Sequence, residues 1–287
     1  MTLQLHILGG GTPQPTPDMF GTAYLLEIDD NRVMFDCGPA ATQKLVRAGV
    51  HPRDVDWMFF THHHFDHDID YPCFLLTRWD SDVGDLERLH VRGPTLTEEM
   101  TRQLVGRGGV YEPDIRSRIE GPHSQRGFAS RGGVLPRPWP VTDAMDIAAG
   151  AVVEGPAWQV RSGHAAHVQP WLDSLAYRLE AAGGHIVFTG DTEPCDEVVA
   201  LAQGADAMVC MCWDHQDAVD KKGSHPGQCG TVGAARMARD AEVPQLILAH
   251  RSPSVVGHAT EERAREDIAS VYDGDVVFAQ ESDVIDI

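Results

Sequence analysis

Residues 57–70, WMFFTHHHFDHDID, constrain the chain most, because four histidines and three aspartates follow directly on an apolar run. The apolar run reads as a buried strand. On an extended backbone, His62 and His64 point to the same side and His63 points away from them. Imidazole nitrogens and carboxylate oxygens are the ligands that zinc takes in open, catalytic sites. The stretch therefore predicts a metal site where a buried strand ends.

The spacing within this stretch offers ligands to two ions. His62 and His64 present a pair of imidazoles to one ion, and Asp66 with His67 presents a carboxylate and an imidazole to a second ion beside it. The alternative is a solvated histidine-rich turn, and His63 reads as a strand-end filler. A surface turn has little need of the apolar strand before it, so we favour the metal site.

Two later strands also end in ligating residues. HIVFTGDTEP ends at Asp191 and QLILAHRSP ends at His250. Strand ends of this kind converge on one edge of a sheet, where sites of α/β proteins form. Each residue alone is a weak signal, since Asp191 also fits the N-cap of a following helix. Together with residues 62–67 they indicate one composite site.

The composition is that of a globular protein. Of the 287 residues, 42% are hydrophobic, and no apolar run is long enough to span a bilayer. We expect a single domain over residues 1–287. The N-terminus lacks the pattern of a secretory signal, and six cysteines show no disulfide-framework spacing. These features predict a cytoplasmic protein with reduced thiols and no membrane partner.

The charge is strongly negative: 43 acidic and 23 basic residues give a net charge of −20. Such a field repels a phosphate backbone, which disfavours a nucleic-acid partner, although a local basic patch would override it. An adaptation to solubility or salt is the simplest reading of this charge. A small-molecule substrate, anionic or activated, is the expected partner, and a homodimer stays open.

The hydrophobic pattern alternates between strands and helices. We expect strands at 3–7, 22–28, 32–38, 56–62, 88–94, 174–181, 185–191, 206–213, 245–250 and lastly 275–279, with two more within 151–164. We expect helices at 39–49, 74–79, 95–106, 195–204, 231–241 and 260–272. The strands come as hairpin pairs in each half, with helices between. The fold class is therefore α/β, or α+β in four layers, with two mixed sheets packed face to face and helices on the outer faces.

Residues 106–140 lose all periodicity and read as a long loop or cap. The segment contains six arginines against three acidic residues: Arg107, Arg116, Arg118, Arg126, Arg131 and Arg137 against Glu112, Asp114 and Glu120. One interpretation is an inserted lid over the metals, in which Arg116, Arg118 and Arg126 bind an anionic substrate group. A dimer contact or a surface loop is the equal alternative.

The motifs resemble those of a known family. HHHFDH, residues 62–67, matches the His-x-His-x-Asp-His signature of the metallo-β-lactamase-fold hydrolases, and VMFDCG, FTGDT and LILAHRSP resemble its other motifs in the expected order. The opening ILGGGTPQPTP and the region 225–250 look most like the ribonuclease Z and arylsulfatase branch. Trp171 and Trp213 flank motif residues and read as core.

The resemblance implies an αβ/βα sandwich with two zinc ions on its edge. One zinc would take His62, His64 and a third histidine, the other would take Asp66, His67 and His250, and Asp191 would bridge them. Asp36 would be structural. The third histidine is His164 or His167, and the sequence HVQP before AYR favours His167, which leaves His164 exposed or behind the ligands. Manganese or iron would fit the same donors.

The resemblance also implies a mechanism. A zinc-activated hydroxide would attack the substrate. Asp66 would orient this nucleophile and accept its proton, and His225 would assist the leaving group. An ordinary loop histidine is the alternative for His225, because MVCMCW lacks the acidic residue that the branch places beside that histidine.

These features predict a metal-dependent hydrolase of a small ester, with a phosphodiester or sulfate ester first. The alternatives are a lactone, amide or carbon–halogen substrate, a transfer RNA 3′-endonuclease, a non-catalytic metal-binding sensor and an iron-dependent redox relative. Only 24 residues separate His167 from Asp191 (191 − 167), too few for the basic arm of the transfer RNA-processing members. An iron-dependent relative would carry an acidic residue in place of His64.

Overall fold

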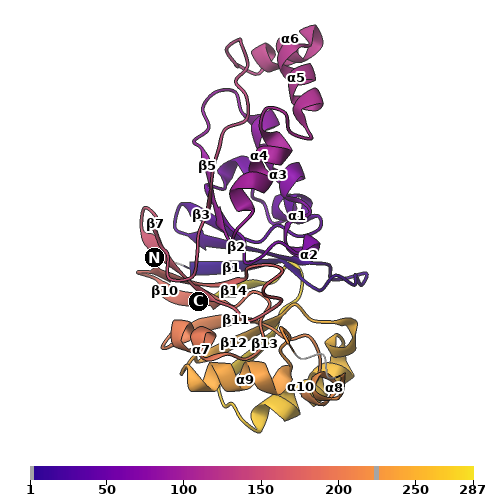
Figure 1. The fold of residues 1–287 in the computed structure, drawn as a ribbon, viewed down its shortest axis with the longest axis vertical. Helices are drawn as coiled ribbons and strands as arrows, with labels where there is room; N and C mark the ends of the chain where they lie inside the picture. Colours follow the sequence, from indigo (N-terminus) through magenta and orange to yellow (C-terminus); the bar gives the residue numbers. More distant parts are fainter. Residues whose placement is uncertain (1–2, 223–225) are drawn as a thin grey trace.

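The computed structural model describes residues 3–222 and 226–287. Two seven-stranded sheets pack face to face with helices outside them (Figure 1). This confirms the expected four-layer α/β sandwich. No helix in the two described ranges combines the length and apolarity needed to cross a membrane.

The first sheet has the strand order β14-β1-β2-β3-β4-β5-β6. Its strands are β1 (Leu3–Gly10), β2 (Thr22–Ile28), β3 (Asn31–Phe35), β4 (Trp57–Phe59), β5 (Leu89–Gly93), β6 (Thr142–Asp146) and β14 (Val284–Asp286). The strands from β14 to β3 pair antiparallel, and those from β3 to β6 pair parallel. The predicted hairpin of β2 and β3 is confirmed.

The second sheet has the order β13-β12-β11-β10-β9-β8-β7. Its strands are β7 (Val152–Glu154), β8 (Trp158–His164), β9 (Leu175–Ala181), β10 (Gly184–Phe188), β11 (Ala207–Met211), β12 (Gln245–Ala249) and β13 (Asp275–Phe278). The strands from β7 to β10 pair antiparallel, and those from β10 to β13 pair parallel. Each sheet therefore combines antiparallel and parallel pairs, which confirms the expected mixed sheets.

Helices cover the outer faces. Beside the first sheet lie α1 (Ala41–Arg47), α2 (Phe65–Asp68), α3 (Tyr71–Ser81) and α4 (Thr97–Val105). Beside the second lie α7 (Asp196–Ala202), α8 (Gln216–Lys222), α9 (Thr231–Asp240) and α10 (His258–Ala269). Short 3₁₀ turns, η1 (Pro52–Asp54) and η2 (Pro253–Val255), join neighbouring elements.

Aromatic side chains fill the layer between the two sheets. Phe35 of the first sheet stacks on Phe188 of the second with ring centres 4.0 Å apart. Phe59 and Tyr177 meet edge to face beside them at 5.4 Å. All four rings are buried, so this layer holds the strand ends of both sheets in fixed register close to the site.

Residues 106–140 were expected to form a long loop or cap, and the loop interpretation is wrong because the segment contains α5 (Glu112–Glu120) and α6 (Pro122–Ser130). Each helix buries only one residue, Ile115 in α5 and Phe128 in α6, so neither shows a hydrophobic period. Each also has proline in its first turn, which favours helix initiation. Further elements that the pattern missed are α8, β6 and β14, the last of which shows that 275–279 is not the final strand.

Candidate metal centre

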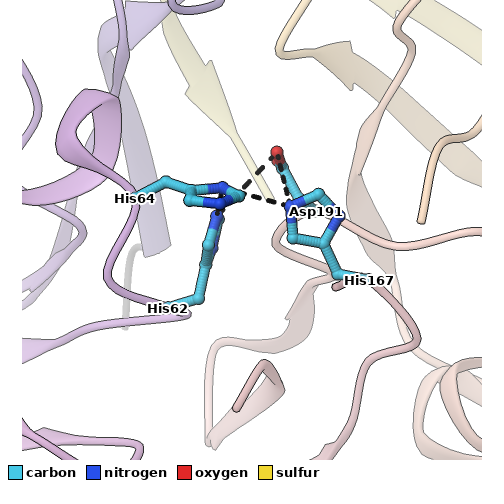
Figure 2. Close-up of side chains that lie close together, drawn as sticks. All are labelled: His62, His64, His167 and Asp191. Atoms are coloured by element: carbon cyan, nitrogen blue, oxygen red, sulfur yellow. Dashed lines mark hydrogen bonds and ion pairs between the residues drawn. The ribbon is translucent and has the colours of Figure 1, made fainter. Parts of the chain in front are cut away.

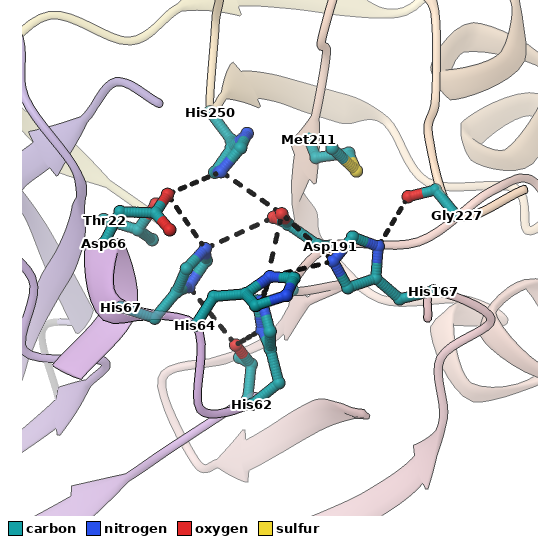
Figure 3. Close-up of polar contacts among 12 residues, drawn as sticks. Thr22, His62, His64, Asp66, His67, His167, Asp191, Met211, Gly227 and His250 are labelled. Atoms are coloured by element: carbon teal, nitrogen blue, oxygen red, sulfur yellow. Dashed lines mark hydrogen bonds and ion pairs between the residues drawn. The ribbon is translucent and has the colours of Figure 1, made fainter. Parts of the chain in front are cut away.

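Seven ionisable residues meet where strands of both sheets end (Figure 3). From the first half, His62 and His64 follow β4, and Asp66 and His67 lie on the single turn of α2. From the second half, His167 follows β8, Asp191 follows β10 and His250 follows β12. The C-terminal ends of β4, β10 and β12 thus supply ligands at one edge of the sandwich.

The first group consists of His62, His64, His167 and Asp191, whose ligating atoms lie within 4.8 Å of one another (Figure 2). His64 Nδ1 lies 3.0 Å from His62 Nε2 and 3.2 Å from His167 Nε2. The structure therefore places His167 in the group. His164 ends β8 with an exposed side chain and is in neither group.

The second group consists of Asp66, His67 and His250, with ligating atoms again within 4.8 Å of one another. Asp66 Oδ2 lies 3.2 Å from His250 Nε2 and 3.6 Å from His67 Nε2. All three residues are buried. Two imidazoles and one carboxylate form the donor set of an open metal site, in which the next position takes water or substrate.

Asp191 lies between the two groups. Its Oδ2 is 3.2 Å from His250 Nε2 and 3.8 Å from His167 Nε2, and its Oδ1 is 3.5 Å from His67 Nε2. One carboxylate therefore faces histidines of both groups, which is the arrangement of a bridging ligand.

Two atoms at this junction lack hydrogen-bond partners. His67 Nε2 and Asp191 Oδ1 are both buried and make no hydrogen bond within the described chain. Buried polar atoms without partners are costly and rare in native proteins. Divalent cations would satisfy both atoms together with the neighbouring imidazoles. The residues present therefore fit a two-ion centre.

The protonation of His62 and of the carboxylates Asp191 and Asp66 suits metal binding. Burial, followed by the charge of His67, holds the pKa of His62 well below its ordinary value, so this imidazole is neutral. Burial alone would raise the pKa of Asp191, but His250 and His67 hold it well below its usual range. The pKa of Asp66 is lowered in the same way by its hydrogen bond to His250, against the opposing effect of burial. Neutral imidazole and ionised carboxylate are the forms that bind metals. Burial alone would lower the pKa of His67, but Asp191 and Asp36 hold it well above its ordinary value, so this ligand has to lose a proton when a metal binds.

Asp36 fixes the orientation of His67 from behind. This buried carboxylate accepts hydrogen bonds from the Thr61 amide at 2.7 Å and the Thr61 hydroxyl at 2.9 Å, and lies 2.8 Å from His67 Nδ1. A carboxylate on Nδ1 requires the proton there and leaves Nε2 free to face Asp66 and Asp191. Asp36 has a left-handed φ of 60° and His250 one of 49°, so the backbone is strained at two residues of the centre.

A family model of the beta-lactamase superfamily domain matches residues 31–251, which include every residue of both ligand groups. The chain belongs to this superfamily. It is therefore a metal-dependent hydrolase with the metallo-β-lactamase fold, as the sequence motifs predicted.

Curated relatives and solved structures agree with this assignment. This chain is 28% identical over 284 residues to ribonuclease Z of Mycobacterium bovis, and the alignment covers 95% of this chain and 94% of the relative. It is 28% identical to ribonuclease BN of an Enterobacter species, covering 87% and 89%. The metallo-beta-lactamase fold protein YhfI from Bacillus subtilis has the same fold, with a TM-score of 0.76 at 18% identity over both whole chains. Human tRNase Z, short form, matches with 0.65 at 19% identity over 98% of each chain.

The other residues that the sequence predicted for the site are not among the described members of the two ligand groups. His225 lies outside the described residues. The described polar contacts of the three predicted arginines are with residues outside the ligand groups. Arg116 contacts Glu120 and Arg126 contacts His123 on their own helices, and Arg118 contacts Asp114 on α5 and Asp80 on α3. Figure 1 shows α5 and α6 at one end of the molecule and α2 near its middle. The structure does not bring these arginines to the ligands, so this arrangement does not form a lid over the metals, which was one of the two interpretations of the segment.

Some residues around the centre were missed by sequence reasoning. Gly227 accepts a hydrogen bond from His167 Nδ1 through its carbonyl at 2.7 Å (Figure 3). Met211 Sδ accepts one from the Thr192 amide at 3.0 Å. His63 is more than a filler, since it lies 2.8 Å from Thr97 Oγ1 on α4. Trp171 is 87% exposed, so its assignment to the core was wrong, whereas Trp213 packs against the core.

Proposed function

We propose that this hydrolase is a metal-dependent phosphodiesterase that acts on a small diester. The observation that carries the proposal is the pair of adjacent ligand groups joined by Asp191. Two ions held side by side stabilise both the attacking and the leaving oxygen of an in-line displacement at phosphorus. A single isolated group would not favour phosphorus over other electrophiles in this way.

Zinc is the proposed metal, since three imidazoles with one carboxylate, and two imidazoles with one carboxylate, are its usual donors. His62, His64, His167 and Asp191 would hold one ion, and Asp66, His67 and His250 would hold the other, with Asp191 shared. When bound, the ions supply Lewis-acid stabilisation of charge and lower the pKa of water.

The chain's own residues do the remaining work. Asp66 Oδ2 faces His250, while Asp66 Oδ1 has no hydrogen bond from a described residue and would accept the proton of the nucleophile. Asp36 keeps His67 in the required orientation through Nδ1. The carboxylates of Asp66 and Asp36 are both buried away from bulk water, which strengthens their electrostatic interactions with the neighbouring histidines.

A small substrate fits the rest of the molecule better than a polymer. The net charge of −20 repels long polyanions, and the arginines of α5 are neutralised by Asp114 and Glu120. Between β8 and Asp191 the described chain contains only a loop and the β9–β10 hairpin.

The second candidate is processing of RNA. It is favoured by the curated relatives named ribonuclease Z, which align with nearly the whole of this chain. RNA is itself a phosphodiester, so both candidates require the same chemistry at the metals and differ in what binds around them. Sulfate esters, lactones and other electrophiles rank below both.

The proposal is tested by turnover of bis-p-nitrophenyl phosphate by zinc-loaded protein. We expect turnover that falls at least about 100-fold in Asp66→Ala, the loss typical of a general base. An exposed carboxylate, Asp18, provides the matched control Asp18→Asn, which should leave turnover unchanged. p-Nitrophenyl sulfate and a precursor transfer RNA are tested in parallel. Absence of diester turnover in protein shown to hold zinc would overturn the proposal, and cleavage of the precursor alone would establish the second candidate.

A further inference from the structure

A cavity of about 260 Å³ lies between α3, the segment 82–88 and the residues that lead into β6. None of the residues that line it belongs to either ligand group. Its volume is just below that of typical small-molecule pockets, so it suits a compact ligand of one or two rings.

Two indole rings form part of the wall of this cavity, and their polar atoms are already used. Trp79 Nε1 donates to the Pro138 carbonyl at 3.0 Å, and Trp139 Nε1 donates to the Val105 carbonyl at 2.7 Å. Both indoles therefore offer only ring surface to a ligand. Arg137 stacks 4.0 Å from the ring centre of Trp79, and Arg107 stacks 4.4 Å from that of Trp139. These contacts hold the two rings in place.

One polar group in the cavity lacks a partner. Arg78 lines the cavity and is 6% exposed, yet the one hydrogen bond of its side chain to the described chain runs from Nε to the Val55 carbonyl at 3.2 Å. Its Nη2 is buried without a hydrogen bond. No described carboxylate lies within ion-pair distance of the guanidinium, and the nearest acidic charges that act on it are those of Asp56 and Asp82. A buried guanidinium in this state is costly unless a ligand pairs with it.

The acidic residues of the lining do not fill this role. Asp82 Oδ1 accepts the backbone amides of Gly84 at 2.6 Å and Asp85 at 3.1 Å, so it holds its own loop. Glu87 and Arg88 are exposed, carry opposite charges and lie at the rim. The cavity therefore presents a guanidinium with one nitrogen that makes no hydrogen bond, beside aromatic and aliphatic side chains.

We propose that this cavity is a ligand site for a small carboxylate with a flat apolar body. The planar guanidinium of Arg78 would pair with the carboxylate, whose geometry it matches in two parallel hydrogen bonds. Trp79 and Trp139 would enclose the body of the ligand. The site is separate from the metal centre, and its test does not depend on hydrolytic activity.

Calorimetric titration of the zinc-loaded protein with 2-naphthoate tests the proposal, with neutral 2-naphthamide as the matched ligand. We expect naphthoate to bind at least about tenfold more tightly than the amide, because the ion pair accounts for the difference. Arg78→Met should remove that preference. Val141→Trp, at a 53% exposed residue of the lining, should obstruct the cavity and weaken naphthoate at least about tenfold without disturbing the core.

Arg161→Met, which removes a half-exposed guanidinium from the second sheet, is the control and should bind like the parent. Circular dichroism establishes that each variant is folded. Three results would overturn the proposal: no binding of naphthoate to the parent, equal binding of acid and amide, or undiminished binding to Val141→Trp. The last result would place the carboxylate elsewhere, such as on the metals.

Discussion

At the scale of single residues, Asp36 shows how a group outside both ligand sets governs the centre. Its oxygens receive three donors, the amide and hydroxyl of Thr61 and the Nδ1–H of His67. An amide side chain has only one oxygen, and its NH₂ group would face donors. The orientation of His67 therefore depends on a carboxylate at this position.

We expect Asp36→Asn to weaken zinc binding about 10–100-fold, the usual loss when a partner behind a histidine ligand is removed. Competition of the protein with a chromophoric chelator measures this affinity. Asp18→Asn, on the surface, supplies the comparison of equal chemistry. Unchanged affinity in Asp36→Asn would show that the remaining contacts orient His67 without the carboxylate.

The ligand groups are the part of the site that the sequence predicts best. His62, His64, Asp66 and His67 are close in sequence and follow one strand, so local geometry alone brings them together. The Gly227 carbonyl and the Met211 sulfur are different, because a backbone carbonyl and a thioether carry no residue-type signal. Such contacts appear only once the tertiary fold is known.

At the scale of elements, tight backbone approach positions α2. A Cβ on Gly38 would lie 2.2 Å from the Asp66 carbonyl oxygen and 2.7 Å from the Thr22 amide nitrogen. Both are backbone atoms that cannot rotate away. The segment after β3 therefore needs glycine for α2 to sit where its ligands reach the centre.

Gly38→Ala should lower the free energy of unfolding by about 1–3 kcal/mol, the cost of overpacking a close contact. Gly127 in α6 provides the opposite case, since a Cβ there meets nothing within 4 Å. Gly127→Ala should raise stability by about 0.5–1 kcal/mol through helix propensity. Urea denaturation of both variants measures the two changes, and a stable Gly38→Ala protein would refute the role given to this contact.

Elements with one buried residue are the ones that the sequence hides. The helices α5 and α6 depend on Ile115, Phe128 and helical ion pairs such as Arg118 with Asp114. Their composition resembles that of a loop. Strands β6 and β14 are short pieces at the edge of a sheet, and their pairing partners β5 and β1 are distant in sequence.

At the scale of the whole molecule, the metal centre joins the two halves of the sandwich. His62 and His64 come from the first half, and His167, Asp191 and His250 come from the second. Each bound ion would act as a crosslink between segments that are far apart in sequence. Metal binding and the stability of the fold are therefore linked.

Removal of metal should lower the midpoint of thermal unfolding by about 5–10 °C. An ion present at 100 times its dissociation constant adds about 2.7 kcal/mol, and each kcal/mol corresponds to about 2–4 °C in a chain of this size. Differential scanning calorimetry with zinc and with excess chelator measures the shift. Asp191→Ala, which lacks the shared carboxylate, should show a smaller one, and equal midpoints in the parent under both conditions would contradict the expected crosslink.

The left-handed backbone of His250 has a consequence for laboratory evolution of this enzyme. A φ of 49° costs a histidine about 1–2 kcal/mol, and asparagine or glycine adopts it more readily. Variants chosen only for heat resistance in metal-poor medium would therefore gain by exchanging this histidine, and would lose catalysis with it. A search for more robust forms of the chain has to score turnover in every round.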